Sequence, residues 1–269
     1  MRTASRITKT CLATAAMAAV SAPGWAANVT LSGTIRDFCA PSIQQTCTTL
    51  SDFETSIPGV VTGMVQTTLG PDGRPVAGPN IVAGNSNATN FGKWYQDSPG
   101  FNSSQPYSVT LNETAPGSGV YTYSNGSFFP IDNQLFGNQG RSHNYHFTLQ
   151  LGGLMSFDNP TAGNDYTFSF TGDDDLWVFV DKKLFLDLGG VHGPATGSFS
   201  EEALVAAGLL PNTDYQLDIF FAERHTVLSN FSITSTLRIK PPVDVPEPGS
   251  LALLALGLVG MGAARRRLR

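Results

Sequence analysis

The chain has 269 residues and a formal net charge of −5, from 16 basic and 21 acidic side chains. Seven of the basic residues lie in the first 26 and the last 19 positions. Between the two ends, 9 basic residues therefore stand against 21 acidic ones, a net charge of −12. An acidic body argues against nucleic acid as a partner. It suits calcium binding, and it keeps an exposed protein soluble.

The N-terminal segment, residues 1–26, is predicted to be a secretory signal peptide. Three basic residues precede an apolar run over residues 11–20, and small residues follow, in the order and length that such signals have. Cleavage after Ala26 fits because Gly24 and Ala26 are small. The alternative is an uncleaved membrane anchor, for which the apolar run is short. We therefore expect an exported protein that is processed by signal peptidase.

Two cysteines remain after the signal peptide, Cys39 and Cys47, within the segment CAPSIQQTC. An even pair in an exported protein favours a disulfide bond. A CxxC or similar metal-binding spacing is absent from the sequence, so a zinc site is not expected. The prediction is a Cys39–Cys47 disulfide that closes a short loop.

The segment 28–240 is predicted to be one all-β domain. It is rich in Gly, Asn, Ser and Thr, and short runs of strand-forming residues are separated by turn signals. The predicted strands are 29–35, 63–69, 107–111, 120–124, 144–151, 166–171, 176–180, 184–187, 215–221 and 230–239. Residues 70–105 are rich in loop residues and are expected to decorate one end. One short helix is predicted, from the capping-box spacing that starts at Ser198 to Gly208.

Several of the predicted strands alternate between apolar and polar residues. Phe168 and Phe170 lie on one side of their strand, whereas Thr167 and Ser169 lie on the other. This pattern places one side on a core and the other toward solvent, as in an antiparallel β-sandwich. Residues 176–180 are apolar on both sides and are therefore expected at a central position. The predicted fold is an antiparallel β-sandwich with long loops.

Three adjacent carboxylates, Asp173, Asp174 and Asp175, stand between two predicted strands. Adjacent like charges at a strand end repel and favour a cation that neutralises them. Calcium takes about six to eight oxygen ligands. Asn230, at the start of another predicted strand, could add an amide oxygen. The alternative is a solvated acidic turn in which the aspartates cap their own backbone.

Three further residues are candidates for ligand binding near this turn. His192 follows a glycine pair and would stand on a loop beside the acidic residues; the alternative is an ordinary exposed histidine. Glu223 and His225 alternate to the same side of the chain, where they could bind metal, act as an acid–base pair or only hydrogen-bond. Arg224 points the other way and is equally a candidate structural partner for an aspartate.

Residues 241–248 are predicted to be a proline-rich, extended linker. VPEP at its end is followed by an apolar stretch over residues 251–264 and an arginine cluster. Residues 246–269 thereby resemble the PEP-type C-terminal sorting signal of bacterial envelope proteins. The resemblance implies processing by an exosortase, transient membrane anchoring through the short apolar helix, and delivery to the cell surface or the exopolysaccharide matrix. The alternative is a plain tail anchor, for which the apolar stretch is short.

The predicted domain resembles the fibro-slime domain from Thr34 to Leu237. The blocks that carry the resemblance are GDDDLWVFVDKKLFLDLGGVHG, DIFFAERHTVLSNFSI, SFFPIDNQLFGN, NYHFTLQL and the opening RDF…SDFE…VTGMVQTTLGPDGRPV. Fibro-slime domains are similar to the protective-antigen-type β-sandwich domains of flocculin-type adhesins, some glycosidases and toxins. The resemblance implies a jelly-roll-like sandwich.

The resemblance also implies roles for individual residues. In the lectin members of the larger family, two aspartates joined by a cis peptide bind calcium, and the metal holds a sugar. These roles fall on Asp173 and Asp174, with Asn230 as a downstream ligand. Asp175 stands where the family has glycine, so it either adds a ligand or blocks the sugar. The sugar-contacting loops of the lectins have no counterpart in this sequence, so sugar identity does not transfer.

We therefore expect an exported, non-enzymatic module at the cell surface or in the extracellular matrix. Its expected partner is exopolysaccharide or a surface glycan, bound through Ca²⁺. One alternative is a structural matrix protein whose calcium only stiffens the sandwich. The other is a glycosidase that uses paired carboxylates such as Asp174 and Glu223. HExxH and GxSxG motifs are absent from the sequence.

Overall fold

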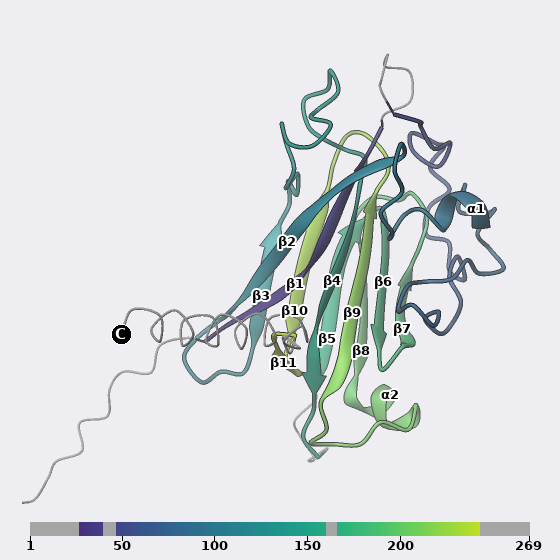
Figure 1. Cartoon of the computed structure of the whole chain (residues 1–269). Helices are drawn as coiled ribbons and strands as arrows, with labels where there is room; N and C mark the ends of the chain where they lie inside the picture. The colour runs from purple at the N-terminus through teal and green to yellow at the C-terminus, as the bar shows by residue number, and fades with distance from the viewer. Residues whose placement is uncertain (1–26, 40–46, 160–165, 243–269) are drawn as a thin grey trace, which may run out of the picture.

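The computed structural model describes residues 27–39, 47–159 and 166–242 (Figure 1). The predicted signal peptide with its cleavage site after Ala26, the linker from residue 243 onward and the sorting signal lie outside these residues. None of the described helices is long and apolar enough to cross a membrane.

Eleven strands in the described residues form one antiparallel sheet (Figure 1). They are β1 (Asn28–Phe38), β2 (Asn102–Glu113), β3 (Tyr121–Asn125), β4 (Phe147–Ser156), β5 (Thr167–Asp173), β6 (Asp175–Val180), β7 (Lys183–Leu188), β8 (Ala195–Ser200), β9 (Tyr215–Glu223), β10 (Asn230–Ser235) and β11 (Arg238–Lys240). Their order is β7-β6-β9-β4-β1-β2-β3-β10-β5-β8, and β11 pairs with β4. The two ends of this order, β7 and β8, pack against each other. The sheet therefore curls almost into a barrel, and the prediction of an antiparallel all-β fold is confirmed.

The interior core follows from the alternation in the strands. Phe168 and Phe170 of β5 and Phe231 and Ile233 of β10 are buried, whereas the residues between them are more exposed. Phe128, from the loop before β4, stacks on Phe231 with their ring centroids 4.6 Å apart. Burying the apolar side of each strand between the two walls of the curled sheet supplies the main stabilisation of the fold.

A second core lies on the outer side of β6 and β9. Alternate residues of β6 face the interior core, whereas Trp177 and Phe179 pack with Trp94 and its neighbours from residues 48–101. This covering segment includes the one-turn helix α1 (Ala88–Phe91), which the sequence did not predict. The loop-rich segment that was expected at one end therefore covers a face of the sheet. β6 was expected at a central position but lies one strand from the end of the sheet order. Its outer side is buried because the covering segment packs on it.

Two predicted strands differ from the structure, and one observed strand was not predicted. The segment 63–69 forms no regular strand and makes only isolated bridges at Val65 and Thr68. The segment 230–239 divides into β10 and β11, because the chain leaves β5 after Ser235 and pairs with β4. β8 was not predicted, because its sequence ATGSFS contains few strand-forming residues.

The predicted helix is present as α2 (Glu201–Ala206) but begins later than expected. Ser198 lies in β8 opposite Ser169, so it does not cap the helix. The N-cap residue is Ser200, whose hydroxyl donates to the Glu202 carboxylate and accepts no hydrogen bond from the helix backbone. Gly208 follows the helix with a φ of 86°, the left-handed conformation expected at a helix end.

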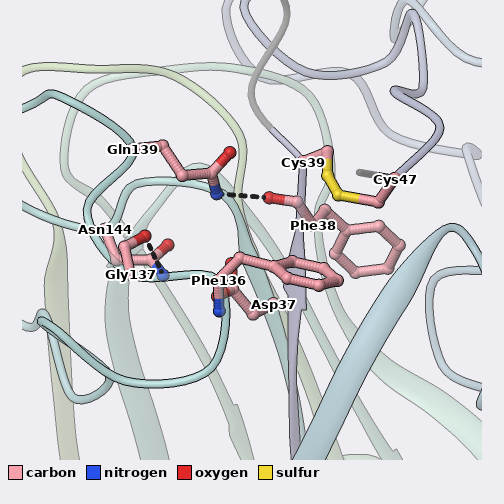
Figure 2. Close-up of a disulfide and its surroundings, with 8 residues drawn as sticks. All are labelled: Asp37, Phe38, Cys39, Cys47, Phe136, Gly137, Gln139 and Asn144. Atoms are coloured by element: carbon pink, nitrogen blue, oxygen red, sulfur yellow. Dashed lines mark hydrogen bonds between the residues drawn. A yellow bond between two sulfur atoms is a disulfide. The ribbon is translucent and has the colours of Figure 1, made fainter. Parts of the chain in front are cut away.

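The predicted disulfide between Cys39 and Cys47 is present (Figure 2). Cys39 directly follows β1, and the two Cα atoms are 6.1 Å apart, a usual separation for a disulfide. The neighbouring Phe38 carbonyl accepts a hydrogen bond of 2.9 Å from Gln139 Nε2. The end of β1 is therefore tied both to the start of the covering segment and to the loop before β4.

Candidate functional site

The acidic turn connects two strands that have different partners. β5 ends at Asp173 beside β10, and β6 begins at Asp175 beside β9, so the chain changes neighbours at Asp174. The peptide bond between Asp173 and Asp174 is cis, as the family resemblance implies. All three aspartates are buried. Their charges therefore depend on the partners that the fold provides.

Asp173 is held by Asn230, its cross-strand neighbour in β10. The Asn230 backbone N–H and side-chain amide both donate to the Asp173 carboxylate, the amide at 2.8 Å. Burial raises the pKa of Asp173 above its ordinary value, and these hydrogen bonds only partly oppose the shift. The expected proximity of Asn230 to the acidic turn is confirmed.

Asp174 accepts hydrogen bonds from two backbone N–H groups. His192 N lies 3.2 Å from its Oδ1, and Arg224 N lies 2.9 Å from its Oδ2. Burial, together with the neighbouring charge of Asp175, raises the pKa of Asp174 to about 8. Among the ion pairs of the described residues, none involves Asp173 or Asp174. This pair of carboxylates therefore favours a proton or a bound cation.

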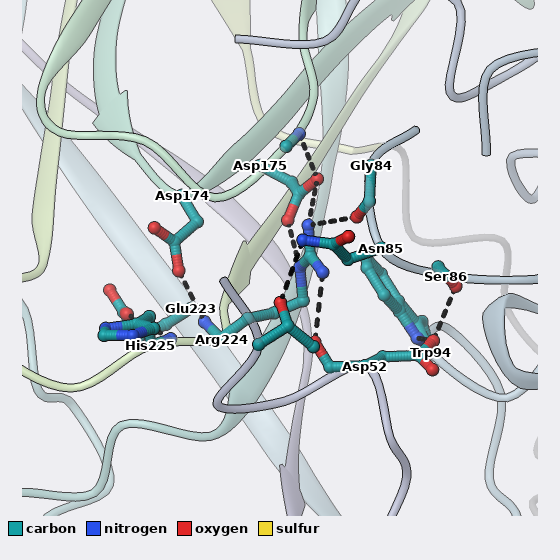
Figure 3. A network of polar contacts seen from close by, with 12 residues as sticks. Asp52, Gly84, Asn85, Ser86, Trp94, Asp174, Asp175, Glu223, Arg224 and His225 are labelled. Atoms are coloured by element: carbon teal, nitrogen blue, oxygen red, sulfur yellow. Dashed lines mark hydrogen bonds and ion pairs between the residues drawn. The ribbon is translucent and has the colours of Figure 1, made fainter. Parts of the chain in front are cut away.

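Asp175 has a different environment, because it pairs with Arg224 (Figure 3). Arg224 Nε lies 2.5 Å from Asp175 Oδ2, and Nη2 lies 3.1 Å from Oδ1, which also accepts Gly190 N at 2.6 Å. Both side chains of the pair are fully buried. Asp175 is therefore not available as a metal ligand, and it does not reach the pocket where it could block a sugar. Both expectations for this residue were wrong, because its charge is neutralised inside the protein.

Arg224 also fastens the covering segment to the acidic turn (Figure 3). Its Nη1 donates to the Asp52 carbonyl at 3.0 Å and its Nη2 to the Gly84 carbonyl at 3.1 Å. The guanidinium lies over the Trp94 ring, 4.9 Å from the ring centroid. One residue thus positions Asp174 through its backbone and the cover through its side chain. The structural alternative for Arg224, as the partner of an aspartate, is confirmed.

Asp173 and Asp174 line a pocket of about 230 Å³. Its other lining residues are Ile57, Val191, His192, Gly193, His225, Thr226, Val227 and Leu228. Two of the predicted ligand-binding residues, His192 and His225, therefore share the pocket with the acidic pair. The ring nitrogens of His192 lie 2.7 Å from the Gly193 carbonyl and 3.2 Å from the Leu188 carbonyl, so its imidazole is engaged with the backbone.

Glu223 does not line this pocket, contrary to prediction. Its side chain is fully enclosed, and its Oε1 accepts the His225 N–H at 3.3 Å. Burial, reinforced by the charges of Asp174 and Asp173, raises the pKa of Glu223 well above its ordinary value. A carboxyl group that is enclosed and does not line the pocket cannot bind a ligand there. It also cannot pair with Asp174 across a cleft as a glycosidase would require.

The loop over residues 225–228 is held by Glu54, a residue that we did not predict. The Glu54 carboxylate accepts Thr226 N at 3.0 Å and the Thr226 hydroxyl at 3.3 Å. It also binds Arg141 and His146, the latter at 2.9 Å. The one sequence signal for Glu54 was its place in the SDFE block of the family resemblance. Its role depends on partners up to 172 positions away.

Replacing Glu54 by Gln is expected to lower the free energy of unfolding at pH 7 by about 1–2 kcal/mol, because the charged donor Arg141 loses its charged acceptor. Burial alone would raise the pKa of Glu54, but hydrogen bonds from His146 and Arg141 lower it to about 2. The carboxylate therefore stabilises the fold above its ordinary pKa of 4.5 and loses this effect as the pH falls toward 2. Urea denaturation should show a gap between wild type and variant that narrows from pH 7 to pH 3.

The exposed Glu202, changed to Gln, is the control and should cost less than about 0.5 kcal/mol at either pH. An equal difference in the free energy of unfolding between wild type and Glu54→Gln at both pH values would contradict the ionisation assigned to Glu54.

The oxygen atoms at the acidic pair have the chemistry that calcium prefers. Asp173 and Asp174 supply two carboxylates that lack an ion-pair partner, and the Asn230 side-chain amide lies beside Asp173, to which its nitrogen donates. Each carboxylate oxygen accepts one N–H group in the structure, which leaves a second lone pair for a metal. No group of three or more His, Cys, Asp and Glu side chains in the described ranges forms a complete metal site. The remaining ligands would have to be backbone, amide, water or sugar oxygens.

Comparison with known proteins identifies two parts of the chain. Residues 114–244 match the PA14 domain, and residues 244–267 match the PEP-CTERM protein-sorting motif. Protein psiQ of Dictyostelium discoideum is 37% identical over 216 residues, which cover 74% of this chain and 21% of that protein. Protein psiD of the same organism is 36% identical over 225 residues, covering 78% of this chain and 42% of that protein. The chain thus spans about a fifth of psiQ and less than half of psiD.

Two solved structures are also similar at a low level. A PA14 sugar-binding domain from an RTX adhesin is 18% identical, with a TM-score of 0.22 over 36% of this chain and 46% of that chain. The PA14 domain of the MpAFP antifreeze protein is 12% identical, with a TM-score of 0.28 over 51% of this chain and 68% of that chain. Likeness at this level says nothing about a ligand. From the matched residues, the chain carries a PA14 domain followed by a PEP-CTERM protein-sorting motif.

Proposed function

We propose that this protein is an exported, non-enzymatic cell-surface module that binds carbohydrate through a calcium ion held at Asp173 and Asp174. The observation that carries the proposal is the division of the three aspartates. Asp175 is neutralised by Arg224, whereas the other two face a pocket without an ion-pair partner in the described residues. The PA14 domain supports a carbohydrate-binding or adhesion role, and the PEP-CTERM motif supports export to the cell surface.

The chemistry of the site follows from these residues. Asp173 and Asp174 would supply the negative charge, and the Asn230 amide oxygen would add a neutral ligand. Asn230 also orients Asp173, while the backbone N–H groups of His192 and Arg224 orient Asp174. A bound calcium ion would attract the hydroxyl oxygens of a glycan, which complete its coordination shell.

The proposed partners follow from the same two features. Exopolysaccharide or a surface glycan is the ligand, and an exosortase and signal peptidase act during export, with transient membrane anchoring through the C-terminal segment. The part of the domain that precedes residue 114 also carries blocks of the fibro-slime resemblance, such as SDFE with Glu54. We propose that the domain is of this type, working at the outer surface or in the extracellular matrix.

Calcium titration of the full-length protein by calorimetry tests the metal site. Wild type should release or absorb heat on binding, and Asp173→Asn or Asp174→Asn should weaken the affinity by at least about 100-fold, since each removes a charged ligand. Asp218→Asn is the matched control, because burial also raises the pKa of Asp218, to about 6, but this residue does not line the pocket. Absence of heat with wild type, or unchanged affinity in both variants, would refute the site.

A glycan array separates the binding module from the structural alternative. The calcium-loaded protein is expected to bind glycans that it loses in the presence of a chelator, and Asp174→Asn should abolish the same signals. Calcium binding by calorimetry without any calcium-dependent glycan signal would favour a matrix protein whose calcium is structural.

A further inference from the structure

The pocket with the acidic pair has an apolar rim that the proposed calcium site does not explain. Ile57, Val227 and Leu228 line it and are 62%, 72% and 55% exposed. Eight large hydrophobic side chains are exposed in the described residues, and three of them meet at this one pocket. We call Ile57, Val227 and Leu228 the apolar rim. Exposed aliphatic groups that gather at a pocket mouth mark a binding surface.

The backbone that carries the apolar rim is fixed in place. Val227 has a φ of 134°, which a β-branched residue adopts only where its surroundings enforce it. Glu54 holds the preceding Thr226 through two hydrogen bonds. On the opposite side, Gly59 N donates to the Val191 carbonyl at 3.1 Å, which ties the segment of Ile57 to the loop beside His192. A rim that is held from both sides can discriminate between ligands of similar shape.

The two sides of the pocket make different demands on one ligand. The side with Asp173 and Asp174 requires hydroxyl oxygens through the proposed cation, whereas the side chains of the apolar rim have no group that hydrogen-bonds a hydroxyl. Tyr, Trp and Phe are absent from the lining residues, and the aromatic rings of this pocket are the imidazoles of His192 and His225. A volume of about 230 Å³ lies below the range of about 300–1,000 Å³ for drug-sized ligands, so one sugar residue is the unit that we place in the pocket.

We propose that the pocket selects 6-deoxyhexoses, sugars that keep their ring hydroxyls but carry a methyl group in place of the hydroxymethyl group. This inference rests on the proposed function, because the ring hydroxyls bind at the cation. The methyl group then lies against the apolar rim. Moving one methyl group from water to an apolar contact improves affinity about fourfold. A 6-hydroxyl left without a partner at the rim widens the difference to about tenfold or more.

Three matched pairs of methyl glycosides test the selection: D-fucose with D-galactose, L-rhamnose with L-mannose, and D-quinovose with D-glucose. Each pair differs only in the 6-hydroxyl, and the three pairs present different arrangements of the ring hydroxyls. Affinities are measured by calorimetry on the full-length, calcium-loaded protein. The 6-deoxy member is expected to bind at least about fourfold more tightly in every pair that binds.

Rim variants assign this preference to named residues. Leu228→Ser and Ile57→Ser should bring the ratio within a pair close to one and leave calcium affinity unchanged. Both side chains are largely exposed, so the fold should tolerate the changes. Leu210→Ser is the matched control, because Leu210 is 66% exposed but does not line the pocket. In the wild-type complex, nuclear Overhauser contacts should join the sugar methyl group to the methyl groups of Leu228.

The outcomes separate this inference from the proposed function. Calcium-dependent binding with equal or better affinity for the 6-hydroxyl sugars overturns the inference alone, as does a preference that survives both rim variants. Binding of none of the six glycosides in calcium overturns the inference and counts against the proposed function. A 6-deoxy preference that is lost in Leu228→Ser and kept in Leu210→Ser supports both.

Discussion

Arg224→Met is expected to lower the free energy of unfolding by about 3–5 kcal/mol at pH 7, the cost of leaving one member of a buried ion pair without its partner. Asp175 would keep a fully buried carboxylate with only the Gly190 N–H to stabilise its charge. The carbonyls of Asp52 and Gly84 would lose their donor as well. Urea denaturation of the full-length protein measures the change. The covering segment should also open before the rest of the sheet in hydrogen exchange.

An exposed ion pair provides the matched control for Arg224. Lys240 binds Asp214 at 2.7 Å, but both side chains are about half exposed, so Lys240→Met should cost at most about 1 kcal/mol. The double variant Arg224→Met/Asp175→Asn should be less destabilised than the sum of its single changes, because no unpaired charge remains. A cost below about 1 kcal/mol for Arg224→Met would show that the ion pair does not hold the site.

Calcium is expected to stabilise the protein more at pH 8 than at pH 5. The pKa of Asp174 is raised from 3.8 to about 8, so its contribution to stability is fully present below pH 3.8 and is lost as the pH rises through about 8. Without calcium, stability should therefore fall by a few kcal/mol between pH 5 and pH 8.5. Calcium binds the ionised carboxylates and should reverse this loss. At a concentration 100 times its Kd it adds about 2.7 kcal/mol, or about 5–10 °C in Tm.

Thermal unfolding with calcium or a chelator at pH 5 and pH 8 measures this linkage. At pH 5, protons compete for the carboxylates and calcium should have a small effect. Asp174→Asn should reduce the pH dependence and abolish the calcium effect, whereas Asp218→Asn should leave the calcium effect intact, because Asp218 lies outside the pocket. An equal calcium shift at both pH values would contradict the prediction.

These two predictions separate residues that are adjacent in the sequence. Asp175 and Arg224 hold the covering segment on the sheet, whereas Asp173 and Asp174 face the pocket with their charges uncompensated. The charge of Asp175 still raises the pKa of Asp174, and the charge of Arg224 partly opposes this repulsion. Arg224 then serves both groups, since its backbone N–H binds Asp174 and its side chain binds Asp175.

Local patterns were sufficient wherever a property depends on neighbours along the chain. The alternation in β5 and β10 predicted which residues enter the core, because side chains in a strand point alternately to its two sides. The pairing of Cys39 with Cys47 followed from two cysteines in an exported chain. The acidic turn, with Asn230 beside it, followed from a short motif and a family resemblance.

Other features depend on contacts between distant segments, which no local pattern encodes. Asp175 and Asp173 are equivalent carboxylates in the sequence. Asp175 became structural because Arg224, which directly follows β9, pairs with it, whereas Asp173 stayed at the pocket. Glu223 was predicted to bind ligand because strand alternation indicates to which side of the chain a side chain points. It does not indicate whether other residues bury that side chain, as they do here. The apolar rim brings Ile57 from the covering segment next to Val227 and Leu228. The sequence alone therefore determined most of the strands, the disulfide and the acidic turn. The tertiary structure decided which carboxylates stay without an ion-pair partner, since burial and charge pairing depend on the whole fold.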